Sequence, residues 1–324
     1  MFFNKKQNVS KISSIECNQY AEDNLSNLKR LMNLMPTHSS KYKIVRKEYY
    51  ARKSGVDGEK YVLRTLQFSN IPMYILHDIS FTNCDNGLIS QIDFILVTQG
   101  SIILLECKNL SSKPYVKIDG KDFFKSRNHC DFPEPIRSPF EQGHEHLKTI
   151  SSLLIKYQNR FLGKKRDCQR LIKSLCVFTG DDVYINRNKA HKDVSDSVVR
   201  IDRLCDKLDF LSSKKKFSSN DMYEIIEFLE LFSEPPERID WFERFNISNE
   251  EFEEFPIYQK LKSFRTKTYK NNKIKAYEVF NNAQIITFIK QNPMTLNELK
   301  LIPNFSEDQI MKYGKQIINI LNTF

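Results

Sequence analysis

Residues 89–110, ISQIDFILVTQGSIILLECKNL, constrain the fold more than any other part of the sequence. Two runs of strand-forming residues meet at Gln99-Gly100, a pair that predicts a hairpin closed by a two-residue turn. Counting outward from this turn brings Asp93 directly opposite Glu106 on the neighbouring strand. The segment therefore predicts a β-hairpin in which two carboxylates face each other.

The register of this hairpin decides whether polar side chains gather on it. The two-residue turn also pairs Gln91 with Lys108. Alternate residues share one face of a strand, so both are expected on the same side as Asp93 and Glu106. A four-residue turn keeps this arrangement, whereas a three-residue turn would pair Asp93 with Cys107 and destroy the site.

These polar residues interrupt a hairpin that is otherwise apolar on both faces, which predicts a buried strand pair. Opposed carboxylates with Cβ atoms about 4.5–5.5 Å apart repel each other unless a cation or a proton lies between them. Mg²⁺ suits Asp93 and Glu106, because it takes one or two carboxylates together with waters and phosphate oxygens. Lys108 could then orient the attacking water and stabilise developing charge. The alternative is a partly exposed strand end with an ordinary Glu/Lys pair.

Helices and strands alternate along residues 15–232. We expect helical structure over residues 15–53, interrupted at Pro36, and a second helix over residues 58–68. A loop rich in Pro, Asn and Asp precedes Ser138, which is a typical helix N-cap. That helix is expected to reach Tyr157. Further strands are predicted at 73–79, 175–180 and 198–201, and a further helix at 220–232. This order predicts an α/β fold with a mixed sheet flanked by helices.

Five short pieces of residues 55–148 resemble the nuclease-related domain (NERD) family of the PD-(D/E)XK nuclease superfamily. They are Gly55-Val56-Asp57-Gly58-Glu59, LHDI at 76–79, QIDFILV at 91–97, LLECKNL at 104–110 and Ser138-Pro139-Phe140-Glu141-Gln142. The family usually has Asn-Pro where this chain has Ser138-Pro139, a change that preserves the helix cap. The resemblance implies a restriction-endonuclease-like fold and a nuclease that depends on Mg²⁺ or Mn²⁺. It implies Asp93, Glu106 and Glu59 as metal ligands, Lys108 as the catalytic lysine and Gln142 as a supporting site residue.

Some polar residues have an ordinary structural explanation as well. At a helix N-terminus, Glu59 is stabilised by the macrodipole, whereas the functional reading makes it an acidic group near the metal. Gln142 is either a common polar residue in the first helical turn or a residue that holds the substrate backbone. His144 and His146 are two positions apart on a helix, so we do not expect them to bind a metal together. His129-Cys130 is likewise not expected to form a site.

Residues 257–324 resemble the HRDC domain, the small helical module at the end of RecQ-type helicases and RNase D. The matching pieces are Tyr277-Glu278-Val279-Phe280, Pro293 to Leu299, Ile302-Pro303-Asn304-Phe305 and Tyr313-Gly314. Asn304 stands where the family usually has Gly, and Asn tolerates the left-handed conformation better than most residues. The resemblance implies a small all-helical domain that binds nucleic acid or, in some members, a protein partner.

The charge of the sequence shifts twice ahead of this module. Residues 234–254 hold eight acidic and two basic side chains, and residues 260–275 hold seven basic and no acidic ones. The basic stretch interleaves with aromatic residues, which is typical of nucleic-acid contacts. The residues expected to contact nucleic acid are Lys262, Arg265, Lys267, Lys270 and Lys273. The runs Lys214-Lys215-Lys216 and Lys164-Lys165-Arg166 are expected to be solvated loops.

The formal net charge of +10 favours a polyanionic partner, either nucleic acid or an anionic membrane surface. We expect a cytoplasmic protein, because no apolar run reaches about 18 residues, no signal core is present, and the seven cysteines form no CxxC. The predicted domains are a helical extension (1–54), a nuclease domain (55–232), an acidic linker (233–256) and an HRDC-like domain (257–324). The predicted function is a metal-dependent nuclease that acts on DNA, and the alternatives are an inactive nucleic-acid-binding protein and an RNA-processing nuclease.

Overall fold

The computed structural model describes residues 20–110, 114–128, 131–161, 171–180, 182–235 and 237–323. The sequence features His129-Cys130 and Lys164-Lys165-Arg166 lie outside these ranges. The chain forms two compact units, the first built on residues 53–237 and the second on residues 23–52 and 238–324.

Unit 1 is organised around a five-stranded mixed sheet with the order β1-β2-β3-β7-β9. Its strands are β1 (Met73–Thr82), β2 (Ile89–Thr98), β3 (Ile102–Asn109), β7 (Ile172–Thr179) and β9 (Val198–Arg200). The first three are antiparallel neighbours joined by short turns, whereas β7 and β9 run parallel to β3. A parallel neighbour requires a crossover connection, which the chain between β3 and β7 provides.

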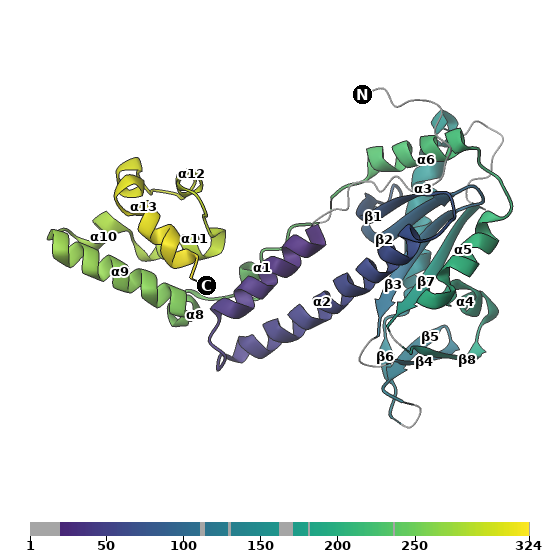
Figure 1. Ribbon diagram of the computed structural model, residues 1–324, viewed down its shortest axis with the longest axis horizontal. Coiled ribbons are helices and arrows are strands. Elements are labelled where there is room, and N and C mark those ends of the chain that lie inside the picture. Colours follow the sequence, from purple (N-terminus) through teal and green to yellow (C-terminus); the bar gives the residue numbers. More distant parts are fainter. Residues whose placement is uncertain are drawn as a thin grey trace. The chain divides into compact units, whose positions relative to one another are not determined.

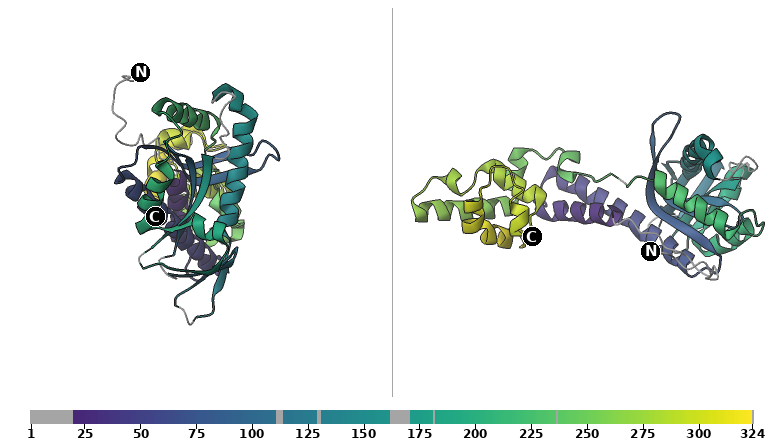
Figure 2. Two further views of the ribbon diagram at one scale, coloured as in Figure 1. Left: turned by 90° about the vertical axis from the view of Figure 1, so that its right-hand side faces the viewer. Right: turned by 90° about the horizontal axis from the view of Figure 1, so that it is seen from above.

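Helices cover both faces of this sheet (Figures 1 and 2). Helices α3 (Pro139–Phe161) and α6 (Ser219–Phe232) share a core with Ile95, Val97, Ile102 and Leu104. Helices α2 (Ser40–Gln67) and α5 (Leu204–Ser212) share the opposite core with Phe94, Leu96, Ile103 and Leu105. The predicted alternation along the hairpin and the mixed α/β class are therefore confirmed.

A second sheet, which the sequence does not predict, occupies much of the expected loop before Ser138. Its order is β6-β5-β4-β8. The strands are β4 (Tyr115–Gly120), β5 (Asp122–Ser126), β6 (Glu134–Ile136) and β8 (Tyr184–Ala190). Val116, Ile118 and Phe123 bury one of its faces against Cys176 and Phe178 of β7. Lys, Asp, Asn and Gly residues interrupt these short strands, so their composition resembles that of a loop. Helix α4 (Lys192–Ser197) and a 3₁₀ turn (Ile201–Arg203) flank β9.

The helices that precede the main sheet begin and end at positions other than those predicted. Helix α1 (Tyr20–Leu34) stops before Pro36, as expected, but α2 continues through Gly55 and Gly58 as one helix. Gly58 is needed for close packing rather than for a helix start, because an added Cβ would lie 2.8 Å from Asn109 Cβ and from Thr179 Oγ1. The helix predicted over residues 58–68 is therefore the last part of α2, and its predicted start is wrong.

Unit 2 is entirely helical in its described residues, in agreement with the predicted class. Besides α1 and the first half of α2, it contains α7 (Trp241–Arg244), α8 (Asn249–Glu254), α9 (Pro256–Asn272), α10 (Ala276–Val279), α11 (Asn282–Gln291), α12 (Leu296–Leu299) and α13 (Glu307–Leu321). The segment predicted as an acidic linker carries α7 and α8, and its Trp241 and Phe252 are buried in the unit's core.

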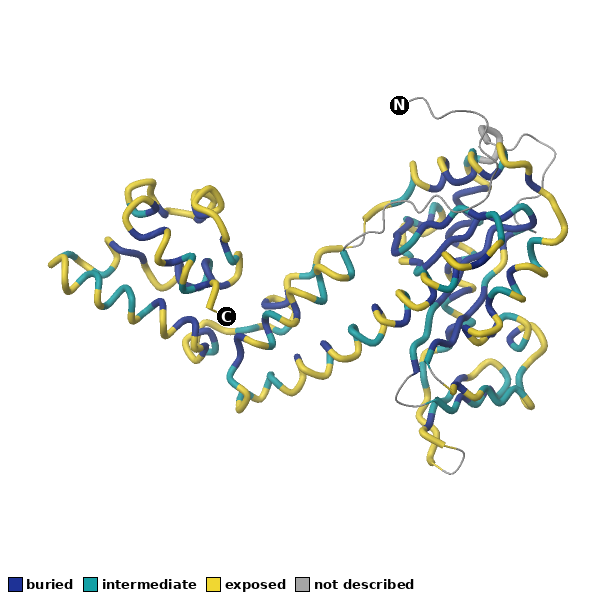
Figure 3. The backbone as a smooth tube through the Cα atoms, viewed as in Figure 1, coloured by how far each residue is buried: buried dark blue, intermediate teal, exposed yellow. Residues whose placement is uncertain are grey.

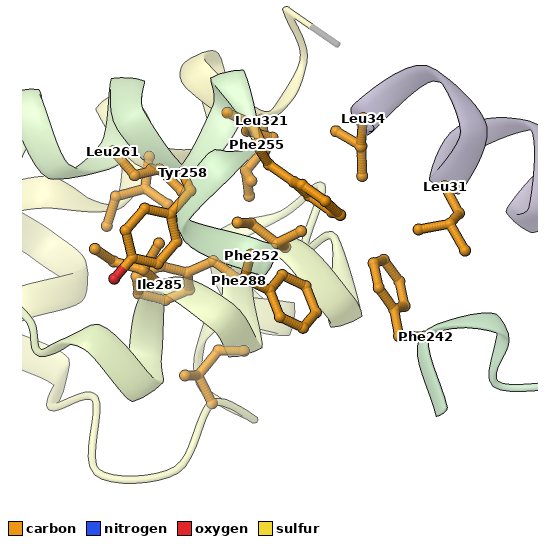
Figure 4. Packing of buried hydrophobic residues seen from close by; sticks show 14 of the residues in the cluster. Leu31, Leu34, Phe242, Phe252, Phe255, Tyr258, Leu261, Ile285, Phe288 and Leu321 are labelled. Carbon is orange, nitrogen blue, oxygen red and sulfur yellow. The ribbon is translucent and has the colours of Figure 1, made fainter. Parts of the chain in front are cut away.

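The core of unit 2 contains residues from α1 and from the C-terminal helices. Leu31 and Leu34 of α1 pack in the same cluster as Phe242, Phe252 and Phe288 (Figure 4). The C-terminal helices of unit 2 therefore share their core with an N-terminal segment.

Local signals in unit 2 behave as the sequence predicts. Ser306 and Gln309 form a reciprocal capping box at the start of α13. Asn304 adopts the left-handed conformation, with φ of 57°. No described helix of the chain is long and apolar enough to cross a membrane.

Candidate functional site

The β2–β3 hairpin has the register that the two-residue turn predicts. Phe94 pairs with Leu105 and Val97 with Ile102, and Thr98 N donates to Ser101 O at 3.0 Å. Regular pairing ends at Phe94 and Leu105, and the two strands separate beyond this pair.

Asp93 lies at the point of separation. Its Oδ2 accepts a hydrogen bond of 2.7 Å from the main-chain N–H of Cys107. The carboxylate therefore takes the place of a main-chain acceptor on β2 and lies between the two strands. Glu106 is the neighbouring residue on β3, so the two predicted carboxylates meet where the sheet opens.

The predicted position of Gln91 is wrong. Ile92 joins Ile95 in the same core, so the alternation of side chains along β2 shifts by one residue at Asp93. The partner strand is irregular at the same level, where Asp78 has φ of 51°. The register between β1 and β2 is the same on both sides of this point, so the alternation changes in both strands together and the following side chains lie on the other face. Gln91 consequently donates to Asp78 Oδ1 at 2.6 Å and does not join Lys108.

Glu106 is held by a chain of hydrogen bonds. Its Oε1 accepts from Lys108 Nζ at 2.6 Å, and its Oε2 lies 3.1 Å from His146 Nε2. His146 Nδ1 lies 2.6 Å from Ser90 Oγ. Glu106 and His146 are only 5% and 7% exposed, so the Glu106 carboxylate is fixed at both oxygens in a buried environment.

Sequence reasoning missed His146. His144 is exposed on another side of α3, whereas His146 is buried. Its contact with Glu106 depends on α3 lying against β3 and β7, a contact between residues far apart in sequence. Gly143 allows that approach, because an added Cβ would overlap Ser174 Oγ on β7. The available signal was the spacing of Gln142 and His146, which places both on one face of the helix.

Gln142 lies one helical turn before His146, near the start of α3. Ser138 caps this helix through a hydrogen bond of 3.3 Å from Glu141 N to its Oγ, as predicted. The Oε1 atom of Gln142 is buried and has no hydrogen-bond partner among the described residues. A buried acceptor of this kind is costly unless a donor or a cation satisfies it.

Glu59 approaches from the opposite helix layer. Its Oε2 lies 3.1 Å from His77 Nε2, and the imidazole of His77 stacks on Phe94 with ring centres 4.5 Å apart. Because α2 begins at Ser40, Glu59 lies in the helix interior, and the macrodipole explanation is wrong. The charge of Glu59 reaches Asp93, so the two acidic groups influence each other.

The pKa values of the two central carboxylates, Asp93 and Glu106, are shifted in opposite directions. Burial raises the pKa of Asp93 well above its ordinary value, and the charges of Glu106 and Glu59 raise it further. Burial also opposes ionisation of Glu106, but hydrogen bonds from His146 and Lys108 and the lysine's charge outweigh burial and lower its pKa. Burial lowers the pKa of Lys108, but the stronger influence of Glu106 leaves it raised. Glu106 and Lys108 therefore form an ion pair beside an Asp93 that retains its proton more readily.

Among the described residues, no three His, Cys, Asp or Glu side chains form a ready-made metal cage. Two carboxylates nevertheless suffice for Mg²⁺, which keeps several waters and prefers oxygen ligands. Besides burial, repulsion by Glu106 raises the pKa of Asp93, and a cation would relieve it; Gln142 Oε1 is a buried oxygen to which none of the described residues donates. The donor set thus fits a hard divalent ion.

Two family models match parts of this chain. Residues 54–179 match the nuclease-related domain, NERD, and residues 254–321 match the HRDC domain. The chain carries a nuclease-related domain and an HRDC domain. A solved structure, D. radiodurans RecQ HRDC domain 3, is 31% identical over 21% of this chain and 88% of its own, with a TM-score of 0.20. No curated protein sequence matches the chain. Both resemblances noted in the sequence are confirmed.

The basic side chains of the HRDC domain differ in their exposure and in their contacts with other groups of the protein. Lys267, Lys270 and Lys273 are exposed on or just after α9. Lys262 lies 3.9 Å from Glu253. Arg265 donates to the main-chain oxygen of Phe280 at 3.2 Å, and its guanidinium lies 5.9 Å from that ring. The first three are therefore available to a ligand, whereas Arg265 contributes to packing.

Proposed function

We propose that the chain is a divalent-metal-dependent nuclease that hydrolyses phosphodiester bonds, with DNA as its preferred substrate. The observation that carries this proposal is the meeting of Asp93 and Glu106 beside Lys108, where β2 and β3 separate inside the nuclease-related domain. Buried charges of this kind add little to stability, so a functional reason for keeping them is the stronger explanation.

Asp93 and Glu106 would hold Mg²⁺ or Mn²⁺ directly, with Glu59 as a further acidic group near the ion. When bound, such an ion polarises the phosphate and lowers the pKa of a water nucleophile. His146 and Lys108 keep Glu106 ionised and oriented, so the carboxylate is ready for the cation. The amide of Gln142 is aimed from the first turn of α3 and can orient a phosphate or a water.

Lys108 has a second role in this proposal. Its ammonium group is positioned by Glu106 Oε1 at 2.6 Å and remains partly accessible, with 28% of its side chain exposed. A fixed positive charge next to the scissile phosphate stabilises the negative charge that develops as the bond breaks. The raised pKa of Lys108 keeps that charge present at neutral pH.

The HRDC domain would add affinity for nucleic acid. Lys267, Lys270 and Lys273 offer positive charge for the phosphate backbone. A protein partner for this domain is the alternative. An inactive nucleic-acid-binding protein and an RNA-processing nuclease remain competing functions for the whole chain. The complete set of Asp93, Glu106 and Lys108 favours an enzyme, and DNA rests on analogy with the family.

The test is cleavage by the purified chain of labelled linear duplex, single-stranded, branched and RNA substrates with Mg²⁺, Mn²⁺ or EDTA. We expect cleavage with a metal and none with EDTA. Asp93→Ala and Glu106→Ala should abolish it, and Lys108→Ala should slow turnover more than it weakens metal binding. Undiminished cleavage by Asp93→Ala would remove the site assignment, and cleavage of RNA alone would select the RNA-processing alternative.

A further inference from the structure

The first half of α2 has an inner and an outer face within unit 2. Val45 and Tyr49 are buried in the unit's core, at 0% and 8% exposure. The outer face is open to solvent along the same turns, as the change of colour along α2 in Figure 3 shows. The exposed side chains of this face are Lys43, Ile44, Arg46, Lys47, Tyr50 and Ala51.

The outer face carries positive charge that no acidic side chain of the described residues neutralises. Within the described chain, Lys43, Arg46 and Lys47 form no ion pair. The neighbouring cations of α2 differ, because Lys41 pairs with Glu251 at 2.7 Å and Arg52 pairs with Glu48 at 2.7 Å. Residues 23–52 hold seven basic and two acidic side chains, which is half of the chain's net charge of +10. The helix thus concentrates unpaired cations on the side away from the core.

Aromatic and apolar surface is interleaved with these cations. Tyr50 is 54% exposed, and the guanidinium of Arg46 lies 5.7 Å from its ring centre. Ile44, at 59% exposure, lies on the same face. An ordinary solvated helix face carries mixed charges and few large apolar side chains. Cations alternating with an exposed ring are instead typical of surfaces that bind nucleic-acid strands.

We propose that the outer face of α2, formed by Lys43, Arg46, Lys47 and Tyr50, binds a single strand of nucleic acid. This proposal rests on the nucleic-acid function proposed above. It adds a binding surface outside residues 254–321, which match the HRDC domain, but within the same compact unit. The three cations contact phosphates, and the ring of Tyr50 stacks on an unpaired base.

The composition of the face favours nucleic acid over an anionic membrane. A helix that lies on a membrane buries a continuous apolar face in the lipid. Here the apolar side of α2 is already used by the protein core, and the large apolar side chains described on the outer face are Ile44 and Tyr50, beside three cations. A single strand is favoured over a duplex because stacking on Tyr50 requires an unpaired base.

The test measures binding of the full chain in EDTA, where cleavage is prevented, to fluorescent single-stranded and duplex oligonucleotides between about 50 and 200 mM salt. For Lys43→Ala/Arg46→Ala/Lys47→Ala, the dependence of log K on log salt should become shallower by about 2 for the single strand. The control Lys214→Ala/Lys215→Ala/Lys216→Ala removes the same charge from exposed positions of unit 1 and should leave the slope unchanged. Tyr50→Ala should lose about tenfold in single-strand affinity and little in duplex affinity, whereas Tyr50→Phe should retain both.

The proposal would be overturned if the α2 variant and the unaltered chain had the same salt dependence. It would also be overturned if both triple variants reduced the salt dependence equally, because net charge alone would then explain the effect. Vesicles containing phosphatidylserine provide the membrane arm. Loss of vesicle binding without loss of oligonucleotide binding would assign the face to a membrane. These outcomes do not depend on cleavage, so an inactive enzyme with the expected slopes would contradict the nuclease proposal and leave this one intact. Unchanged melting temperatures establish that the variants are folded.

Discussion

His146 Nε2 lies 3.1 Å from Glu106 Oε2, while Lys108 Nζ lies 2.6 Å from the other oxygen of the same carboxylate. Glu106 therefore has little freedom to rotate, and its negative charge is stabilised from two directions. The imidazole is itself fixed by Ser90 Oγ at 2.6 Å from Nδ1. In a metal site, residues that orient a ligand by hydrogen bonding in this way increase the affinity of the site for the metal ion.

Replacing His146 should therefore impair cleavage by weakening the binding of the metal ion. We expect His146→Ala to lower the cleavage rate about 10- to 100-fold at limiting Mg²⁺, with partial recovery at high Mg²⁺. His146→Gln, whose amide can donate to Glu106, should retain more activity. The measurement is the cleavage rate as a function of Mg²⁺ concentration. His144→Ala, which alters an exposed histidine two residues away, is the control and should match the unaltered chain. An unchanged Mg²⁺ requirement for His146→Ala would show that the hydrogen bond is incidental.

Asp93 should destabilise the metal-free protein at neutral pH. Its folded-state pKa is raised by burial and by Glu106 and Glu59, so the folded protein favours the protonated form. The contribution of this group to stability is present at low pH and is lost as pH rises through the raised pKa. Asp93→Asn cannot ionise, so in EDTA it should be more stable than the unaltered chain by about 1–3 kcal/mol at neutral pH. The difference should shrink toward zero near pH 4, where carboxyls of the unfolded chain also become protonated.

Glu106→Gln is the control, because it should change the stability of the protein at neutral pH in the opposite direction. The pKa of Glu106 is lowered by His146 and Lys108 despite burial, so its stabilising contribution is present at neutral pH and lost as pH falls. Thermal melting in EDTA across this pH range should show Asp93→Asn above and Glu106→Gln below the unaltered chain at neutral pH. The same sign for both variants would contradict the division of charge between the two carboxylates.

The sequence predicts the hairpin well because local rules determine it. The turn at Gln99-Gly100 fixes the register, and apolar alternation fixes the faces as far as Phe94. It does not predict Gln91, because an irregularity shared with β1 at Asp78 reverses the alternation there. It predicts the start of α3 from the Ser138 cap but not the role of His146, which arises from packing across 40 residues of sequence.

The HRDC domain offers three exposed lysines whose removal should weaken binding to duplex DNA. Lys267→Ala/Lys270→Ala/Lys273→Ala should make the dependence of log K on log salt shallower by up to about 3, since each phosphate contact contributes nearly one unit. The measurement is duplex binding of the full chain in EDTA between about 50 and 200 mM salt. Lys300 and Lys312, paired with Glu307 and Asp308, provide a control double alanine variant with a smaller effect. If the slope does not change, the domain is better assigned to a protein partner.

Ending the chain at Phe255 should destabilise what remains of unit 2. Leu28, Leu31 and Leu34 share a core with residues of α9, α11 and α13, and all three are fully buried. Removing those helices exposes this apolar surface at a cost of about 25 cal/mol per Å². We expect the shortened chain to lose a thermal transition and to associate in solution, while the core of unit 1 remains folded. Thermal melting and light scattering measure both. A shortened chain that stays monomeric and keeps every transition would show that residues 23–52 fold without the C-terminal helices.

Gly143 tests whether the approach of α3 to the sheet sets the site. An added Cβ would overlap Ser174 Oγ and lie 3.2 Å from Ser174 Cβ, so in Gly143→Ala the Ser174 hydroxyl must rotate away and α3 must shift from β7 by a few tenths of an ångström. Overpacking typically costs about 1–3 kcal/mol, which exceeds the gain of up to about 1 kcal/mol from replacing a helical glycine. Because α3 carries Gln142 and His146, cleavage should fall together with stability.

Gly55→Ala is the matched control for this experiment. It changes another helical glycine, but an added Cβ there has nothing within 4 Å, so stability should rise slightly. Ser174→Ala removes the overlapping oxygen and should recover part of the loss in Gly143→Ala, giving a coupling of about 0.5–3 kcal/mol in a double-mutant cycle. Recovery should remain partial, because the Ser174 Cβ is still close. If the two substitutions are additive in unfolding free energy, the contact between α3 and β7 does not determine the position of Gln142 and His146. Recovery of stability without recovery of cleavage would show instead that Ser174 contributes to the site through its hydroxyl group.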